Sequence, residues 1–123
     1  MPVKPHFDFA VIDMTEGWET PPGYPAGVKV KVLAGGLDEV AKKGHRTTIT
    51  RFAPGTVLES VPTHDFVEEV IALEGELLCY APADGRIVGR VTKHSYVCRQ
   101  PGVPHGPFRT ETGYMSMQFC YYP

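Results

Sequence analysis

The chain has 123 residues, of which 42% are hydrophobic and 21% charged, and its formal net charge is −2. This length suffices for one domain with its own core, so disulfide bonds are not required. The near balance of 12 basic and 14 acidic residues offers no charged surface for nucleic acid or an anionic membrane. There is neither a membrane-length apolar stretch nor a signal-peptide pattern. We therefore expect a cytoplasmic protein without nucleic-acid or membrane partners.

The first 27 residues are too rich in proline and glycine for a long regular element. They contain five prolines and three glycines, which interrupt both helices and central strands. We expect residues 1–27 to form an extended N-terminal arm. Phe7, Phe9, Val11 and Trp18 are the side chains predicted to anchor this arm on the body of the protein.

From Val28 onward the sequence changes to short β-rich runs separated by glycine, proline and aspartate turns. The expected strands cover residues 28–33, 46–52, 66–73, 76–80, 87–91, 96–99 and 114–122. Asp84-Gly85 is typical of a hairpin tip. The one helical candidate is residues 37–43, which end before Gly44. The pattern predicts an all-β sandwich or barrel over residues 28–123.

Three cysteines and a set of aromatic and methionine residues are interpreted as core. Cys79, Cys98 and Cys120 are odd in number, widely spaced and without a CxxC frame, so we expect small buried hydrophobic side chains. The larger core candidates are Phe66, Phe108, Tyr114, Met115, Met117, Phe119, Tyr121 and Tyr122.

The most informative segment places a histidine and a glutamate four residues apart. In a strand this even spacing puts His64 and Glu68 on the same face. An imidazole and a carboxylate on an inward face are costly to bury, and a divalent metal offsets that cost. Glu69 has the opposite parity and is expected on the solvated face. A further histidine, His105, lies in a Pro/Gly-rich frame that restrains its backbone, as a metal ligand requires.

These residues resemble the motifs of the cupin superfamily. The first cupin motif runs glycine, about five residues, His-x-His, three or four residues, glutamate, six residues, glycine. Gly55, His64, Glu68 and Gly75 fall in its register, with a leading gap of six residues. Pro62 stands where the motif has its first histidine, so one metal ligand of the family pattern is missing.

The second cupin motif is matched in part, by Gly102 and His105. His94, Gln100 and Arg109 replace its opening glycine, its proline and its asparagine. The resemblance extends over residues 28–121 and is similar to small single-domain cupins, including the cupin domain of anti-sigma factors and small aromatic-ketone dioxygenases. It implies a cupin-type double-stranded β-helix, a jelly-roll barrel.

The resemblance also implies a metal held by His64, Glu68 and His105. Two histidines and one carboxylate with open positions favour iron(II), and Zn, Mn and Ni also accept this ligand set. Cupins often dimerise through N-terminal strands, which implies a homodimer formed through residues 1–27.

A carboxylate-bearing substrate would bind best to the paired N–H donors of an arginine, and Arg51, Arg99 and Arg109 are the candidates. Alternation in the strand 46–52 puts Arg51 and Ile49 on one face and Phe52 on the other, without identifying the inward face. Arg51 is the favoured catalytic arginine, whereas Arg99 and Arg109 are expected at the surface.

Three functional hypotheses follow from these observations. The first is an iron(II) dioxygenase of a small oxygenated substrate, aromatic or diketone-like. The second is a non-redox metal-dependent isomerase, cyclase or decarboxylase in which Glu68 or a tyrosine moves a proton. The third is a cupin that binds a metal or small ligand without catalysis.

Overall fold

The computed structural model describes residues 4–59 and 63–123. Within these residues the regular structure is entirely β, which confirms the predicted fold class. The strands are β1 (Val28–Asp38), β2 (Lys43–Phe52), β3 (Val57–Leu58), β4 (Val67–Gly75), β5 (Leu77–Tyr80), β6 (Ile87–Val91), β7 (Tyr96–Arg99), β8 (Phe108–Arg109) and β9 (Tyr114–Tyr121). Across the described residues, no helix has the length and apolar character needed to cross a membrane.

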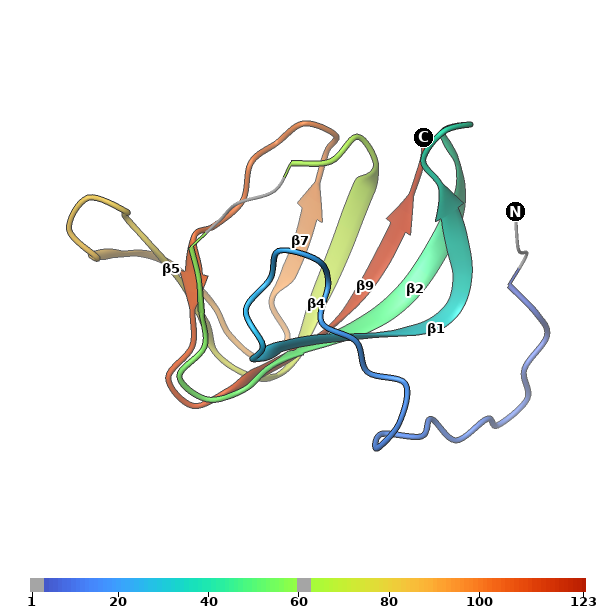
Figure 1. The fold of residues 1–123 in the computed structure, drawn as a ribbon, viewed down its shortest axis with the longest axis horizontal. Coiled ribbons are helices and arrows are strands. Elements are labelled where there is room, and N and C mark those ends of the chain that lie inside the picture. Colours follow the sequence, from blue (N-terminus) through green and yellow to red (C-terminus); the bar gives the residue numbers. More distant parts are fainter. Residues whose placement is uncertain (1–3, 60–62) are drawn as a thin grey trace.

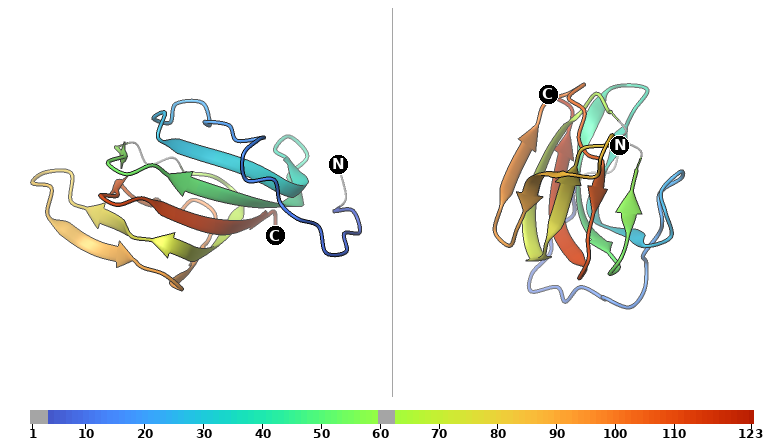
Figure 2. Two further views of the ribbon diagram at one scale, coloured as in Figure 1. Left: turned by 90° about the horizontal axis from the view of Figure 1, so that it is seen from below. Right: turned by 90° about the vertical axis from the view of Figure 1, so that its left-hand side faces the viewer.

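The strands form two antiparallel sheets in a jelly-roll arrangement. The larger sheet has the order β1-β2-β9-β4-β7, and the smaller has the order β3-β8-β5-β6. Figure 1 shows the larger sheet curving across the molecule with β5 and its neighbours to one side. The two further views show the smaller sheet lying over one face of the larger one (Figure 2). Side chains on that face are therefore enclosed between the sheets.

Strand positions follow the predictions closely, but the helix expected at residues 37–43 is wrong. Leu37 pairs with Gly44 and Asp38 with Lys43, so the segment is the end of a β-hairpin. The Asp38 carboxylate accepts hydrogen bonds from the backbone N–H groups of two residues in the turn. Such a turn competes directly with a short helix. β3 and β8 were not predicted, since two-residue strands carry no periodicity.

The N-terminal arm attaches through its second half. The backbones of Glu19 and Val30 pair through two hydrogen bonds of 2.9 and 2.7 Å, and the Trp18 ring lies against the outer face of β2. Phe7 and Phe9, like Val11, are exposed, so the prediction that these three side chains anchor the arm is wrong. The observed attachment depends on backbone pairing, which hydrophobic side chains do not reveal.

The core lies between the sheets, toward one end of the barrel. It is a cluster of buried side chains from both sheets: Val28, Phe52, Leu58, Ala72, Leu77, Phe108 and Tyr114. Strand β9 alternates, with buried Tyr114, Ser116, Gln118 and Cys120 facing inward. The intervening Met115, Met117, Phe119 and Tyr121 face the other way and are only partly buried or exposed, contrary to the core assignment.

The cysteines differ from one another in burial. Cys120 is buried and Cys79 partly buried, but Cys98 is exposed, which corrects the expectation for that residue. On β7, Val97 and Arg99 line the inner cavity while Cys98 has the opposite parity.

Two glycines of the first cupin-like motif differ in how closely another backbone segment approaches them. Gly75 and Gly55 both have positive φ, +74° and +82°. A Cβ at Gly75 would lie 2.0 Å from the Gly113 carbonyl oxygen, whereas a Cβ at Gly55 would meet nothing within 4 Å. We expect Gly55→Ala to cost about 1–2 kcal/mol from backbone strain alone. Gly75→Ala should cost about 1–3 kcal/mol more because of the overlap.

Equilibrium urea denaturation of the two variants measures this difference. Equal losses in the free energy of unfolding would contradict the close approach of β4 to the segment before β9.

Candidate metal centre

His64 and Glu68 come from the start of β4 and lie on the same side of it. His64 is in the segment just before the strand and Glu68 is its second residue. Their side chains are 16% and 20% exposed, and His64 Nε2 lies 4.0 Å from Glu68 Oε2. The even spacing therefore brings an imidazole and a carboxylate together at the edge of the interior.

The His64 ring is held in one orientation. It stacks on Phe66 with the ring centroids 3.9 Å apart, and its Nδ1 lies 3.0 Å from the Phe66 carbonyl oxygen. Because a carbonyl oxygen only accepts, Nδ1 carries a hydrogen, which leaves Nε2 as the nitrogen that can ligate a metal. That Nε2 is buried and has no hydrogen-bond partner among the described residues. A buried, unpartnered imidazole nitrogen is what a metal ligand looks like without its metal.

His105 is brought to the same place by the loop between β7 and β8. The Gly102 backbone N–H donates to the His64 carbonyl oxygen (2.8 Å), which ties this loop to the segment before β4. His105 Nδ1 lies 3.4 Å from the Val103 carbonyl oxygen. Burial lowers the pKa of His105, and the positive charge of Arg99 lowers it further. The ring is therefore neutral at neutral pH, as metal ligation requires.

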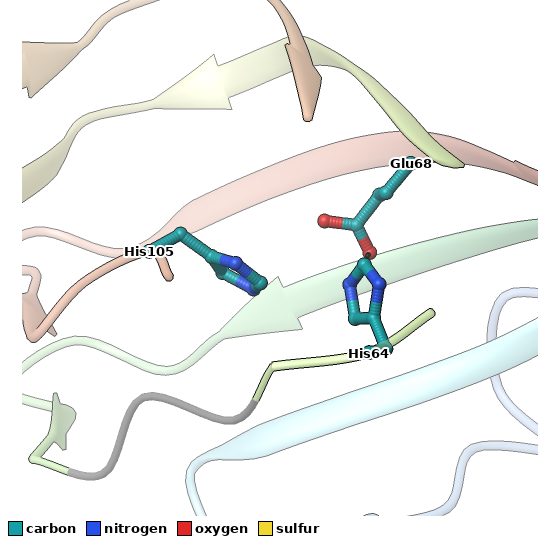
Figure 3. A group of neighbouring side chains, drawn as sticks. All are labelled: His64, Glu68 and His105. Carbon is teal, nitrogen blue, oxygen red and sulfur yellow. Dashed lines mark ion pairs between the residues drawn. The ribbon is translucent and has the colours of Figure 1, made fainter. Parts of the chain in front are cut away.

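The three predicted metal ligands converge. One ligand atom from each of His64, Glu68 and His105 lies within 4.8 Å of the others. Figure 3 shows the three side chains directed toward one another from separate segments. Bonds of about 2.0–2.2 Å place neighbouring ligands of one first-row ion about 3–3.5 Å apart, so these side chains would move about 1 Å closer together when a metal binds. These residues fit a divalent metal. Pro62, at the position of the missing family histidine, lies outside the described residues.

A cavity of about 310 Å³ between the sheets adjoins these ligands. Its volume is at the small end of the roughly 300–1,000 Å³ typical of small-molecule sites. Most of its walls are apolar, from residues such as Val70 and Phe108, and Tyr24 of the arm closes part of it. Burial raises the pKa of Tyr24 and of Tyr114, and the negative charge of Glu68 raises both further. Both phenols stay protonated at neutral pH.

Polar side chains on β2 and β9 bond to one another deeper in the cavity. Gln118 Oε1 accepts hydrogen bonds from the hydroxyls of Thr48 (3.0 Å) and Thr50 (2.9 Å). Its amide nitrogen donates to the Ser116 hydroxyl. This network satisfies its own buried groups.

The structure does not bring Arg51, the catalytic arginine predicted from the sequence, to the three ligands. Arg51 is on the outer face of β2, with its guanidinium 4.1 Å from the centroid of the Trp18 ring. Arg109 is not among the residues that line the cavity, and its Cζ lies 5.5 Å from the centroid of the Tyr80 ring. Arg99, expected at the surface, lines the cavity. Glu69, as expected from its parity, points away from the ligands and accepts a hydrogen bond from an exposed tyrosine.

Sequence reasoning missed Arg46, which also lines the cavity. Continuing the alternation of β2 backward from Phe52 reaches Thr50, Thr48 and then Arg46 on the same face. The signal was present, but it required knowing that the Phe52 face is the inner one.

Neither a protein-family model nor a curated protein sequence matches the chain. Solved structures do. KdgF from Halomonas sp. is 14% identical, with 91% of each chain covered and a TM-score of 0.65. An RmlC-like cupin from Shewanella frigidimarina is 19% identical, with 95% of this chain and 93% of that one covered and a TM-score of 0.63. An acetylacetone dioxygenase from Acinetobacter johnsonii is 14% identical, with 97% and 78% covered and a TM-score of 0.64.

The chain therefore has the cupin fold, which confirms the expectation drawn from its motifs. Similar structures also include a polyketide cyclase and the cupin_2 domain of a transcriptional regulator. The fold thus occurs in catalytic and regulatory proteins, and function has to be argued from the site.

The reactivity of the Cys120 thiol, which lies beside the metal ligands, tests whether the inner face of the larger sheet is enclosed. Cys120 Sγ lies 3.9 Å from Glu68 Oε2, and the residue is 1% exposed. Burial raises the pKa of Cys120 to about 11, with Glu68 contributing, so only about one thiol in a thousand is ionised at pH 8. Iodoacetamide at pH 8 should alkylate exposed Cys98 well before Cys120, which should react only in denaturant.

Peptide mapping by mass spectrometry after timed pulses gives both rates. Comparable rates in the native protein would contradict the enclosed, carboxylate-facing position of Cys120.

Proposed function

We propose that this protein is a metal-dependent cupin enzyme, a mononuclear iron(II) dioxygenase of a small oxygenated organic substrate, aromatic or diketone-like. The observation that carries the proposal is the convergence of His64, Glu68 and His105 beside a small, largely apolar cavity. The fold similarity to an acetylacetone dioxygenase supports the reaction class. Glu68 is both a metal ligand and the residue at the metal centre that we expect to accept or donate a substrate proton.

The ligand set determines the chemistry that is proposed. When bound, iron(II) supplies a Lewis acid and redox chemistry toward dioxygen, at coordination positions that the three protein ligands leave open. In a dioxygenase reaction that cleaves a C–C bond, one oxygen atom enters each of the two carbonyl products, so dioxygen is the only oxidant and no external reductant is consumed.

The chain's own residues bind and orient the substrate. The protonated hydroxyls of Tyr24 and Tyr114 are donors for substrate oxygen atoms, and the apolar walls around Phe108 exclude water from the carbon skeleton. A favourable position of both oxygen atoms and skeleton lowers the entropic part of the barrier.

A non-redox reaction is the second candidate. The similarity to a polyketide cyclase favours it, together with the buried phenols that lie close enough to feel the charge of Glu68. In that case Glu68 accepts a proton from a substrate carbon and a tyrosine donates one to a carbonyl oxygen, with no consumption of O₂.

Metal analysis combined with His105→Ala tests the proposal. The purified protein should contain about one iron per chain when prepared without oxygen, and its substrates should be found by screening aromatic ketones and β-diketones for O₂ uptake. His105→Ala should lower metal affinity by at least about 10- to 100-fold, because a ligand and not merely its support is removed. His45→Ala, an exposed histidine on β2, is the matched control and should retain metal and turnover.

The outcomes separate the candidates. Turnover of a carbonyl compound without O₂ uptake favours the non-redox enzyme, and stoichiometric zinc without turnover favours a binding protein. Unchanged metal content and activity in His105→Ala would overturn the metal centre itself.

A further inference from the structure

Two arginines flank Glu68 on the inner face of the larger sheet. Arg46 on β2 is opposite Cys120 on β9, Cys120 is opposite Glu68 on β4, and Glu68 is opposite Arg99 on β7. These four residues therefore form one transverse row across four neighbouring strands. All four line the cavity.

The cavity has more positive than negative charge. Among the described residues that line the cavity, Glu68 is the one carboxylate, against the two guanidinium groups of Arg46 and Arg99. In the described part of the chain, neither arginine forms an ion pair within 4.0 Å. A divalent cation at the ligands would increase the positive excess further. A low-dielectric cavity with such an excess favours an anionic ligand.

Aromatic rings adjoin both guanidinium groups without using their hydrogen-bond donors. Arg46 Cζ lies 5.9 Å from the centroid of the Phe66 ring, and Arg99 Cζ lies 5.7 Å from that of Phe108. The Nε of Arg46 is buried and has no hydrogen-bond partner among the described residues. A buried guanidinium nitrogen without a partner is costly, and an acceptor from a bound ligand would relieve that cost.

We propose that the substrate is a small carboxylate, whose carboxylate group binds Arg46 and Arg99 while its other oxygen atoms bind at the metal centre. The binding of the other oxygen atoms at the metal centre rests on the proposed function, whereas the binding of the carboxylate by the two arginines does not. A planar guanidinium binds a carboxylate through paired N–H donors, and the size of the cavity limits the ligand to a small molecule. Arg46 and Arg99 are thus specificity-determining residues.

Two probes that differ by one carboxylate test the proposal. Acetylacetone is a neutral β-diketone, and acetopyruvate has the same five-carbon chain with a carboxylate at one end. Binding is followed by the NMR signals of arginine Nε–H groups in ¹⁵N-labelled protein, with and without Zn²⁺ as a redox-silent metal. The Arg46 signal, assigned by its loss in Arg46→Gln, should shift with acetopyruvate and not with acetylacetone.

Affinities in three variants provide the quantitative test. Arg46→Gln and Arg99→Gln should each weaken acetopyruvate binding by about 10- to 100-fold, and change acetylacetone binding by less than about twofold. Arg51→Gln, on the outer face of β2, is the matched control and should change neither. If a glutamine variant fails to fold, Arg46→Lys keeps the charge without the planar donor pair and should show an intermediate loss.

Equal effects on both probes, or no effect on acetopyruvate, would overturn the carboxylate proposal. The measurements with Zn²⁺ test the metal centre independently of that result. If acetopyruvate still requires both arginines while Zn²⁺ neither binds nor alters its affinity, then the proposed metal enzyme fails and the anion site stands.

Discussion

The desolvation of Glu68 is the constraint around which the inner face of the larger sheet is organised. A carboxylate that is only 20% exposed loses hydration worth several kcal/mol unless other groups compensate. Within the described residues its neighbours are a neutral thiol, an imidazole at 4.0 Å and an arginine on the adjacent strand. None is a close, charged partner. A divalent cation bound by Glu68, His64 and His105 would supply the missing compensation.

Backbone geometry brings the three ligands together from distant parts of the sequence. The pleat of the strand puts His64 and Glu68 on one face, and the hydrogen bond from Gly102 to the His64 carbonyl fixes the second loop beside the first. Gly102 adopts a positive φ of +79° within that loop. The glycines and prolines around His105 thus act through local backbone conformation, and a site on two tethered segments is more precisely positioned than one on free loops.

Much of the fold and the ligand set could be predicted from the sequence because both depend on local rules. Strand parity relates His64 to Glu68, and turn residues delimit β6 and β7. Parity alone does not say which face of a strand is buried, so Arg51 was favoured although Arg46 and Arg99 line the cavity. The absolute face depends on the opposite sheet, which is information from residues far away in the chain. The hairpin at residues 37–43 differs from the predicted helix for a local reason, because the turn made by the Asp38 carboxylate competes with a short helix.

The two ends of the cavity differ in polarity, and the end that contains Arg46, Glu68 and Arg99 is the one that can select a substrate by its charge. Along β2, Arg46 and Phe52 are six residues apart, about 20 Å of strand. Between them, Thr48 and Thr50 bond to Gln118, whose amide is already committed to Ser116, so this middle zone offers few free donors or acceptors to a ligand. At the far end the Phe52 and Tyr114 rings pack edge to face and fill the space. Recognition of a charged group is therefore confined to the row of Arg46, Glu68 and Arg99 and to the adjoining ligands, where a substrate's carboxylate and its metal-binding oxygens would have to lie together.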